Sequence, residues 1–348
     1  MDLSISRLAG LGWDHRFATE FAALAPPGTR PARVALVAAG SITIADGDGM
    51  RSVSLAGRLR SAPPLGGVTT GDWVAADDAV AHAVLPRRSA LLRHAAGRTS
   101  NAQAVAANLD TVFIAVPLDT GVNPRRIERS LAIAWSSGAQ PVVLLTKSDL
   151  SADLTADVAA ARAVTGAAAV VAVSAQGMGI EALRALLIAA HTGAIIGPSG
   201  AGKSTLVNAL CGEERLATAL VRGDGRGRHT TTHRELVLLP GGALLIDTPG
   251  MREMGVWDAQ TGIDAVFTDL AELAARCRFR DCSHRDEPGC ALRVAAIDNP
   301  AILARLASLR KLEDEQRRQE EAAGSRRQAQ PPRDLKRPVR GTRDEPHR

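Results

Sequence analysis

The sequence predicts a multidomain chain in which a small β-barrel precedes an α/β domain with a buried parallel sheet, followed by a compact C-terminal segment with a metal cluster. Three observations predict this fold class. Short alternating strands and turns fill residues 31–95, apolar runs without alternation recur between helical stretches from about residue 105, and three cysteines lie within fourteen residues near the C-terminus. The 348 residues are enough for two or three domains.

The composition argues against a membrane-spanning or secreted protein, and the charge is concentrated at one end of the chain. No run of about 18 uncharged apolar residues occurs, and the stretch Met1–Gly10 lacks the apolar core of a signal peptide. We therefore expect a cytoplasmic protein that does not enter a membrane. The net charge of +5 lies in residues 301–348, because residues 1–300 carry 29 basic and 29 acidic side chains. This basic end is either a contact for nucleic-acid phosphates or a solvated end.

Residues 1–30 are predicted to form an N-terminal arm with a short helix, and residues 31–98 to form the barrel. Five strand candidates lie in the barrel region, separated by turns. They are residues 34–37, 42–44, 53–59, 72–74 and 81–85. Five short strands in this length fit a small barrel such as an OB-fold, and an SH3-like barrel would give a similar pattern.

Residues 99–260 are predicted to form the α/β domain. Six apolar runs alternate with helical stretches, which indicates fully buried strands in a doubly wound sheet. The runs are residues 112–116, 142–145, 170–173, 194–196, 236–239 and 244–246.

A glycine-rich loop follows the run 194–196. Its residues match the pattern G-x-x-x-x-G-K-[ST], and a helical pattern comes after them. The predicted phosphate-binding residues are Gly197, Pro198, Ser199, Gly200, Ala201, Gly202, Lys203, Ser204 and Thr205. Backbone N–H groups of such a loop surround phosphate oxygens, Lys203 is expected to reach the β- and γ-phosphates, and the Ser204 hydroxyl to bind Mg²⁺. The loop predicts a nucleoside triphosphate without identifying its base.

Two motifs after the preceding buried strands predict that the base is guanine. The first consists of Thr146, Lys147, Ser148 and Asp149 and resembles the N-K-x-D motif of GTPases, with threonine in place of the usual asparagine. The Asp149 carboxylate can accept two N–H donors that guanine presents and adenine does not. The second, Ser174 and Ala175, resembles the supporting motif in which a backbone N–H contacts the base carbonyl. Lys147 and Lys203 are the only lysines in residues 1–300.

A D-x-x-G motif, residues 247–250, follows the last apolar run. Asp247 is expected to hold Mg²⁺ through water, and the Gly250 N–H to contact the γ-phosphate. Between the two phosphate motifs lies a loop rich in glycine and threonine, as a nucleotide-dependent switch requires. The predicted Mg²⁺ ligands are Ser204, Thr231 and Asp247, and the predicted catalytic residues are Lys203, Thr231 and His229.

Met251 follows Gly250 at the position where Ras-like enzymes carry a glutamine that orients the attacking water. A thioether cannot orient water, so slow intrinsic hydrolysis is expected. His229 is the internal candidate for this task, and a solvent-exposed or RNA-contacting histidine is the alternative.

The order of these motifs is circularly permuted. Ras-like GTPases place the phosphate loop first and the guanine motifs last, whereas here the guanine motifs come first. The permutation preserves the site because the loops stay at the same edge of the sheet. It also places the D-x-x-G motif directly before the cysteine segment.

A metal cluster is predicted near the C-terminus from three cysteines and one histidine. Cys277, Cys282, His284 and Cys290 make a complete Cys₃His set, suited to one structural Zn²⁺ with no open position. The segment between them has few apolar residues, so metal is expected to be needed for its folding. Residues 261–322 are predicted to form this zinc-binding domain, and residues 323–348 a basic disordered tail.

Together these residues resemble the RsgA/YjeQ family of GTPases that depend on the small ribosomal subunit. The resemblance covers about residues 31–320 and rests on the motifs above, on the string 227–236, and on the cysteine string 277–290. It implies a multidomain fold: a small β-barrel (OB-fold), an α/β P-loop GTPase domain with circularly permuted motifs, and a C-terminal α-helical zinc-binding domain. It also implies binding to the small ribosomal subunit and its rRNA late in assembly, hydrolysis of GTP stimulated by that subunit, Mg²⁺ with the GTP, and the four zinc ligands already named. We expect a monomer.

Other functions remain open on the sequence. Aromatic residues are scarce and tyrosine is absent, so the barrel has few groups on which RNA bases can stack. An RNA-binding zinc protein that holds nucleotide with little hydrolysis is the main alternative. An ATP-dependent enzyme conflicts with Asp149, and a GTPase acting on the large subunit would not be expected to carry the zinc segment.

Overall fold

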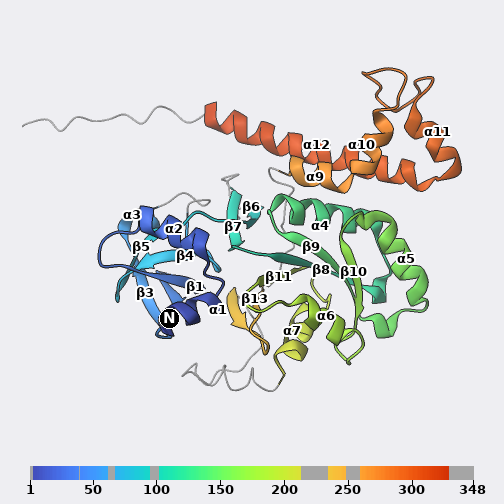
Figure 1. Cartoon of the computed structure of the whole chain (residues 1–348). Coiled ribbons are helices and arrows are strands. Elements are labelled where there is room, and N and C mark those ends of the chain that lie inside the picture. Colours follow the sequence, from blue (N-terminus) through green and yellow to red (C-terminus); the bar gives the residue numbers. More distant parts are fainter. Residues whose placement is uncertain are drawn as a thin grey trace, which may run out of the picture.

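The computed structural model describes residues 3–38, 40–61, 67–94, 102–212, 234–247 and 259–328. It shows a strand-rich N-terminal part, a central α/β part, and C-terminal helices that lie along one side of the centre (Figure 1). Within these ranges, no helix is long and apolar enough to span a membrane.

The N-terminal arm contains two helices where the sequence predicts one: α1 (Leu3–Gly10) and α2 (His15–Leu24). Asp14 caps α2 by accepting a hydrogen bond from the Phe17 N–H at 3.1 Å. The buried Phe17 ring packs with Trp13 and with Trp73 of the barrel, and the two tryptophan rings are 4.7 Å apart. Because Trp73 is fully buried in this cluster, it is not available to stack on an RNA base.

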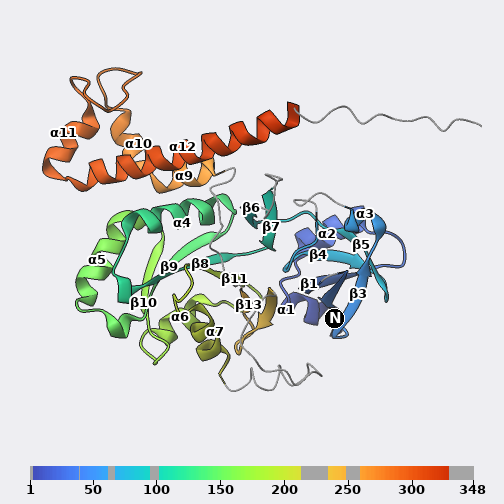
Figure 2. The ribbon, with the colours of Figure 1, turned by 180° about the vertical axis from the view of Figure 1, so that it is seen from behind.

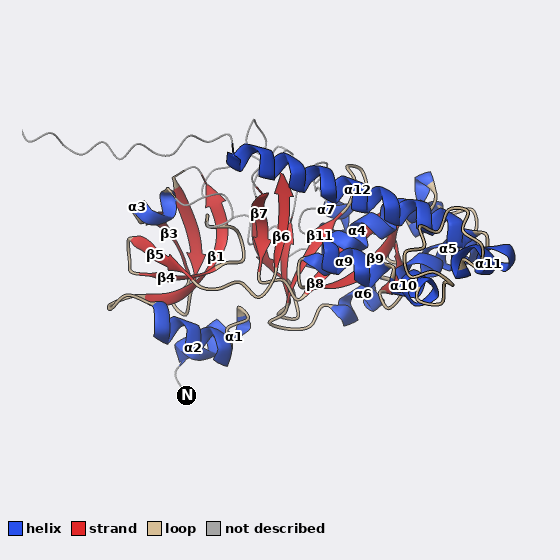
Figure 3. Cartoon of the chain, turned by 90° about the horizontal axis from the view of Figure 1, so that it is seen from above, coloured by secondary structure: helices blue, strands red, loops and turns tan. Residues whose placement is uncertain are grey.

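Five strands close into a barrel beside the arm (Figure 3). They are β1 (Arg30–Ala38), β2 (Ser41–Ala45), β3 (Met50–Leu55), β4 (Trp73–Ala76) and β5 (Val80–Val84). The order is β1-β2-β3-β5-β4, and β4 returns to pair with β1. A short helix, α3 (Gly57–Arg60), follows β3. Five strands closed in this way form the OB-type barrel that the sequence predicts.

A two-stranded hairpin lies between the barrel and the α/β part (Figure 3), formed by β6 (Ala90–His94) and β7 (Ala102–Ala107). Its buried side chains Leu91 and Val105 belong to the same apolar cluster as the α/β sheet. The predicted boundary between residues 98 and 99 therefore falls inside one hairpin, and this hairpin packs with the α/β part.

Six strands of the described chain make the α/β sheet. They are β8 (Thr111–Pro117), β9 (Gln140–Thr146), β10 (Ala169–Val173), β11 (Thr192–Ile196), β12 (Glu235–Leu238) and β13 (Leu244–Asp247). The order is β10-β9-β8-β11-β13-β12, with only β12 antiparallel to its neighbour. The carboxyl ends of β9, β10, β11 and β13, each followed by a predicted motif, therefore lie at one edge. β12 also pairs with β1, between Glu235 and Leu36, so the sheet continues into the barrel.

Helices cover both faces of this sheet. On one face lie α4 (Pro124–Ser136) and α5 (Leu154–Thr165), and on the other α6 (Ile180–Leu186) and α7 (Lys203–Cys211). Along β8, Val112 and Ile114 face the first pair, whereas Phe113 and Ala115 face the second. Burial on both faces explains why these strands have continuous apolar sequences.

The C-terminal helices are α9 (Gln260–Val266), α10 (Thr268–Ala274), α11 (Ala291–Asp298) and α12 (Ala301–Gln328). Helix α9 lies so close to α4 that a β-carbon on Gly262 would be 2.0 Å from the Ala132 carbonyl oxygen. Helix α12 runs back along α9 and α4 (Figure 2), where Arg305 forms an ion pair with the buried Glu128 at 3.0 Å. The C-terminal part is therefore fastened to the face of the central domain that α4 covers.

A buried arginine joins the arm, the barrel and the α/β part. Arg33 on β1 is fully buried, and burial lowers its pKa to about 10, so it stays charged at neutral pH. Its guanidinium donates to four oxygens drawn from all three parts. They are the carbonyls of Leu11, Gly71 and Asn108, at 2.7, 2.7 and 3.1 Å, and the Thr192 hydroxyl at 3.1 Å.

We expect Arg33→Met to lower the free energy of unfolding by about 2–3 kcal/mol, because methionine leaves buried carbonyls without their donor. Urea and thermal unfolding, followed by circular dichroism, measure the change. Arg30→Met is the matched control: it lies on the same strand, but its partners Asp48 and Asp78 are exposed. The control should cost less than about 1 kcal/mol. Equal transition midpoints for the two variants would contradict the joining role of Arg33.

Candidate nucleotide-binding site and metal centre

Of the nine residues predicted to bind phosphate, six form the loop between β11 and α7, and the last three lie in the first turn of α7. The loop backbone takes positive φ angles of 149° at Gly197 and 80° at both Gly200 and Gly202, which favour glycine. At Gly197, a β-carbon would also lie 2.6 Å from the Ala115 carbonyl oxygen on β8. The glycine therefore lets the loop lie close against β8 before the chain enters α7, whose N-terminal N–H groups favour anions.

Lys203 is the first residue of α7, and only 9% of it is exposed. Its ammonium donates to the carbonyls of Gly197 at 2.9 Å and Pro198 at 2.7 Å, which holds the charge at the loop. Ser204 and Thr205 follow in the first turn of α7, and both are exposed. The charge and the two hydroxyls are thus placed next to the glycine-rich backbone.

The base loop, residues 146–149, starts at the carboxyl end of β9. Thr146 is fully buried, and its hydroxyl donates to the carbonyl of Ala201 in the phosphate loop at 2.8 Å. Lys147 then takes a left-handed conformation with φ +56°, and the 3₁₀ turn η2 (Ser148–Leu150) follows. The hydrogen bond from Thr146 to Ala201 brings two of the predicted motifs together, although they are far apart in the sequence.

The second guanine motif orients the Asp149 carboxylate. Ser174 is buried at the end of β10 and donates its hydroxyl to Asp149, while the Gln176 N–H donates to the Ser174 oxygen at 3.2 Å. Asp149 itself is exposed, as is Ala175 beside it. The arrangement presents a carboxylate of fixed orientation, an acceptor for two N–H groups of a ligand.

A residue that the sequence reasoning missed also belongs to this edge. Asp119 lies in the 3₁₀ turn η1 (Leu118–Thr120) after β8, and its carboxylate forms an ion pair with the Lys147 ammonium. An acidic residue two positions after a buried strand was the signal available in the sequence, since β8 ends at the same edge as β9.

We expect Asp119→Asn to weaken binding of GDP about two- to five-fold, because the partly exposed ion pair holds the Lys147 stem in place. Titration of the variant with fluorescent GDP measures the affinity. Asp119→Glu keeps the charge and should recover most of the binding. A normal affinity for GDP in the asparagine variant would show that the ion pair does not position Lys147.

Other predicted nucleotide ligands are only partly within the described residues. Asp247 ends β13, next to the strand that leads into the phosphate loop. Its side chain lies outside the described residues, as do His229, Thr231 and Gly250.

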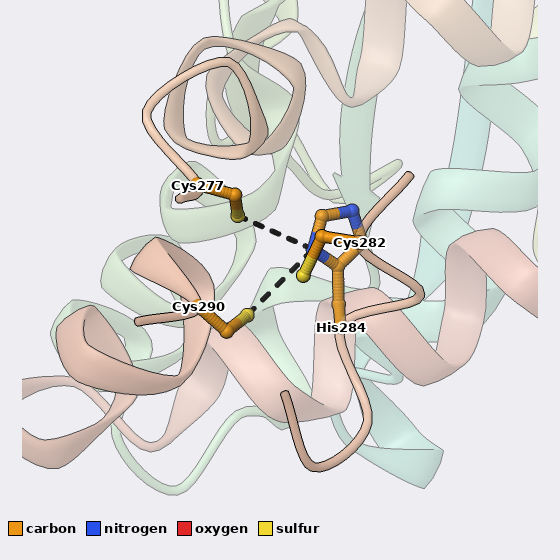
Figure 4. Close-up of side chains that lie close together, drawn as sticks. All are labelled: Cys277, Cys282, His284 and Cys290. Carbon is orange, nitrogen blue, oxygen red and sulfur yellow. Dashed lines mark hydrogen bonds between the residues drawn. The ribbon is translucent and has the colours of Figure 1, made fainter. Parts of the chain in front are cut away.

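The four predicted metal ligands meet in one cluster between α10 and α11 (Figure 4). The ligand atoms of Cys277, Cys282, His284 and Cys290 lie within 4.8 Å of one another. The His284 Nδ1 atom is 3.5 Å from the Cys277 sulfur and 3.6 Å from the Cys290 sulfur, so it is the nitrogen that faces the cluster. The set can therefore hold a metal ion.

Hydrogen bonds outside the ligand set shape the loop that carries His284. The Glu287 carboxylate accepts bonds from the Ser283 hydroxyl and from the N–H groups of Ser283, Arg285 and Asp286. These bonds, with that of the Ser283 hydroxyl first, lower the pKa of Glu287 to about 2, so it is ionised at neutral pH. The Ala291 N–H donates to the Cys277 sulfur at 3.3 Å. Sequence reasoning did not identify these supporting contacts.

Known proteins resemble this chain over most of its length. A sequence model of the family described as RsgA GTPase matches residues 84–257. The protein named Small ribosomal subunit biogenesis GTPase RsgA from Streptomyces coelicolor is 44% identical over 325 residues, which cover 90% of this chain and 87% of that protein. Its namesake from Opitutus terrae is 45% identical over 332 residues, 89% of each chain.

Solved structures agree with the sequence comparison. YjeQ from Thermotoga maritima matches with a TM-score of 0.58 at 25% identity, over 82% of this chain and 97% of that one. YloQ, described as a circularly permuted GTPase, matches in fold with a TM-score of 0.57 at 19% identity, over 82% and 96% of the two chains.

Proposed function

The chain belongs to the RsgA GTPase family and is a GTP hydrolase, and from this we propose that it acts in biogenesis of the small ribosomal subunit. We propose further that it binds that subunit and its rRNA late in assembly and hydrolyses GTP faster when bound. The small ribosomal subunit as partner is supported by the names of the relatives, which are small ribosomal subunit biogenesis GTPases. Within the molecule, the direct contact between the base loop and the phosphate loop, from Thr146 to Ala201, supports one joint guanine nucleotide site most strongly.

In this site, Asp149 would accept the N–H donors of guanine and the backbone at Ala175 would contact its carbonyl. The loop from Gly197 to Thr205 would hold the phosphates, with Lys203 at the β- and γ-phosphates. Ser204, Thr231 and Asp247 would hold Mg²⁺, which supplies positive charge that neutralises the phosphate oxygens. The exposed position of Ser204 at the start of α7 fits this role. His229 is the proposed partner of the attacking water.

The metal of the C-terminal cluster is proposed to be Zn²⁺. With bonds of about 2.3 Å to sulfur and about 2.0–2.1 Å to nitrogen, tetrahedral Zn²⁺ places sulfur and nitrogen ligands about 3.5–3.6 Å apart. The two sulfur–nitrogen distances at His284 are 3.5 and 3.6 Å. Three thiolates and one imidazole leave no open position, so the role is structural.

Because we propose that this enzyme acts on ribosomal subunits, we also propose that it works in the cytoplasm. We propose that two features contact rRNA phosphates: the exposed arginines around the metal centre, and the segment 301–348, which carries a net positive charge. Nucleotide hydrolysis by one chain needs no second copy, and we propose that it works as a monomer.

GTP hydrolysis measured with and without purified small ribosomal subunits tests this function. Strong stimulation by small subunits, and none by large subunits, is the expected result. Hydrolysis at one rate under all three conditions would remove the proposed partner and leave the GTPase chemistry in place.

A further inference from the structure

The hydroxyl of Thr146 is committed to the phosphate loop. Thr146 is fully buried at the end of β9, and its hydroxyl donates to the Ala201 carbonyl, 55 positions further along the chain, at 2.8 Å. A threonine hydroxyl has a single hydrogen to donate, so this bond leaves none for a ligand. The side chain therefore joins the base loop to the phosphate loop and has no donor to offer a base.

The other side chains of the base loop show the same division. The Ser148 hydroxyl donates to the Met178 sulfur at 3.4 Å, and the Lys147 ammonium is held by Asp119. Asp149 remains as an exposed carboxylate, which only accepts hydrogen bonds. The loop thus presents an acceptor for N–H groups, while both of its hydroxyl donors are engaged within the protein.

Guanine carries hydrogen-bond donors on N1 and N2 and acceptors at O6 and N7. We propose that Thr146 is a positioning residue that fixes the base loop to the phosphate loop, and that the protein consequently recognises guanine without reading N7. This inference rests on the proposed function, because it assigns base recognition to residues 146–149. It deepens that function by naming which edge of the base determines specificity.

Asparagine, the usual residue at this position of the motif, would differ in one chemical respect. Its amide carries two N–H hydrogens, so one can keep the bond to the Ala201 carbonyl while the second remains for the base. Threonine can make only the first of these bonds. The Thr146→Asn substitution should therefore create recognition of N7 that the natural chain lacks.

Competition against fluorescent GDP, with the full-length protein, measures the affinities for GDP, 7-deazaguanosine diphosphate, inosine diphosphate and ADP. The 7-deaza nucleotide replaces N7 with a carbon and should bind within about two-fold of GDP. Inosine diphosphate lacks the N2 amine, so Asp149 accepts one hydrogen bond fewer from the base. It should therefore bind at least about five-fold more weakly than GDP. Inosine diphosphate thus serves as the control that the assay detects the loss of a single hydrogen bond.

Three substitutions separate positioning from folding. Thr146→Asn should bind GDP about five-fold or more tightly than the 7-deaza nucleotide. Thr146→Ser keeps the hydroxyl and should retain both the affinity and the equal binding of the natural chain. Thr146→Val removes the contact with Ala201 and should weaken both nucleotides alike, with their ratio unchanged.

Two outcomes would overturn the inference, and they are distinguishable. If the natural chain binds the 7-deaza nucleotide about five-fold or more weakly than GDP while ADP still binds poorly, N7 is read and only this inference fails. If ADP binds as tightly as GDP, the proposed guanine site fails, and this inference fails with it.

Discussion

A Lys203→Ala variant will hydrolyse GTP about 100- to 1,000-fold more slowly than the natural protein at saturating nucleotide. The ammonium of Lys203 is held at the phosphate loop by the carbonyls of Gly197 and Pro198. Negative charge that develops on the phosphate oxygens during transfer is stabilised by a cation fixed at that point, and a methyl group supplies none. Single-turnover hydrolysis, with protein in excess over GTP and small ribosomal subunits present, measures the chemical step.

Lys147→Ala is the matched control for this experiment, because Lys147 is the only other lysine in residues 1–300 and lies in the base loop. It should weaken binding of GTP but leave the rate at saturating GTP within about three-fold. Equal losses of rate in the two variants would mean that Lys203 acts through binding or folding instead of through charge at the phosphates.

The α/β part could be predicted from sequence because its central strands are buried on both faces. The runs 142–145 and 194–196 are continuous apolar segments, and they form β9 and β11. Once the strands are parallel, their carboxyl ends meet at one edge, so the motifs after them had to be neighbours. The metal ligands could also be predicted from the sequence, since Cys277 and Cys290 are close in sequence and thiolates bind a narrow range of metals.

Local patterns were less reliable where two structures satisfy the same spacing. The segment 53–59 was predicted as one strand, but β3 ends at Leu55 and α3 begins at Gly57. Val53, Leu55 and Leu59 fit the alternation of a strand, and the last two also have the i, i+4 spacing of a helix. Packing against the rest of the barrel decides between the two, and packing is not visible in the pattern.

Outside the motifs, individual side-chain contacts between distant parts of the chain were not predicted. In the sequence, Arg33 has the pattern of an ordinary polar residue in a strand. Its burial was not predicted because its partners Asn108 and Thr192 lie 75 and 159 positions away. The ion pair between Asp119 and Lys147 depends in the same way on two strands being neighbours. Such contacts follow from the tertiary structure, whereas the motifs follow from the chemistry of short segments.

Removal of the metal will unfold the segment between α10 and α11 while the nucleotide site stays able to bind GTP. Apart from the ligands, this segment exposes most of its side chains, so it has little apolar burial of its own. Binding of a structural Zn²⁺ supplies about 10–16 kcal/mol, which such a segment needs to fold. Trypsin reports the change directly, because the exposed Arg276, Arg278, Arg280 and Arg285 all lie in it. We expect cleavage there to be about ten-fold faster or more after chelation.

Cys290→Ser tests the same point without a chelator, and Cys211→Ser is its matched control. Both cysteines are buried, but only Cys290 belongs to the metal cluster, whereas Cys211 is the last residue of α7. The natural chain and the Cys211 variant should each contain about one Zn²⁺ and resist trypsin, and the Cys290 variant should contain little zinc and be cleaved. GDP affinity should stay within about two-fold in the Cys290 variant, since the bond from Thr146 to Ala201 and the bonds from Lys203 to the phosphate loop do not involve the cluster. Full zinc content in that variant would show that the four side chains do not act together as ligands.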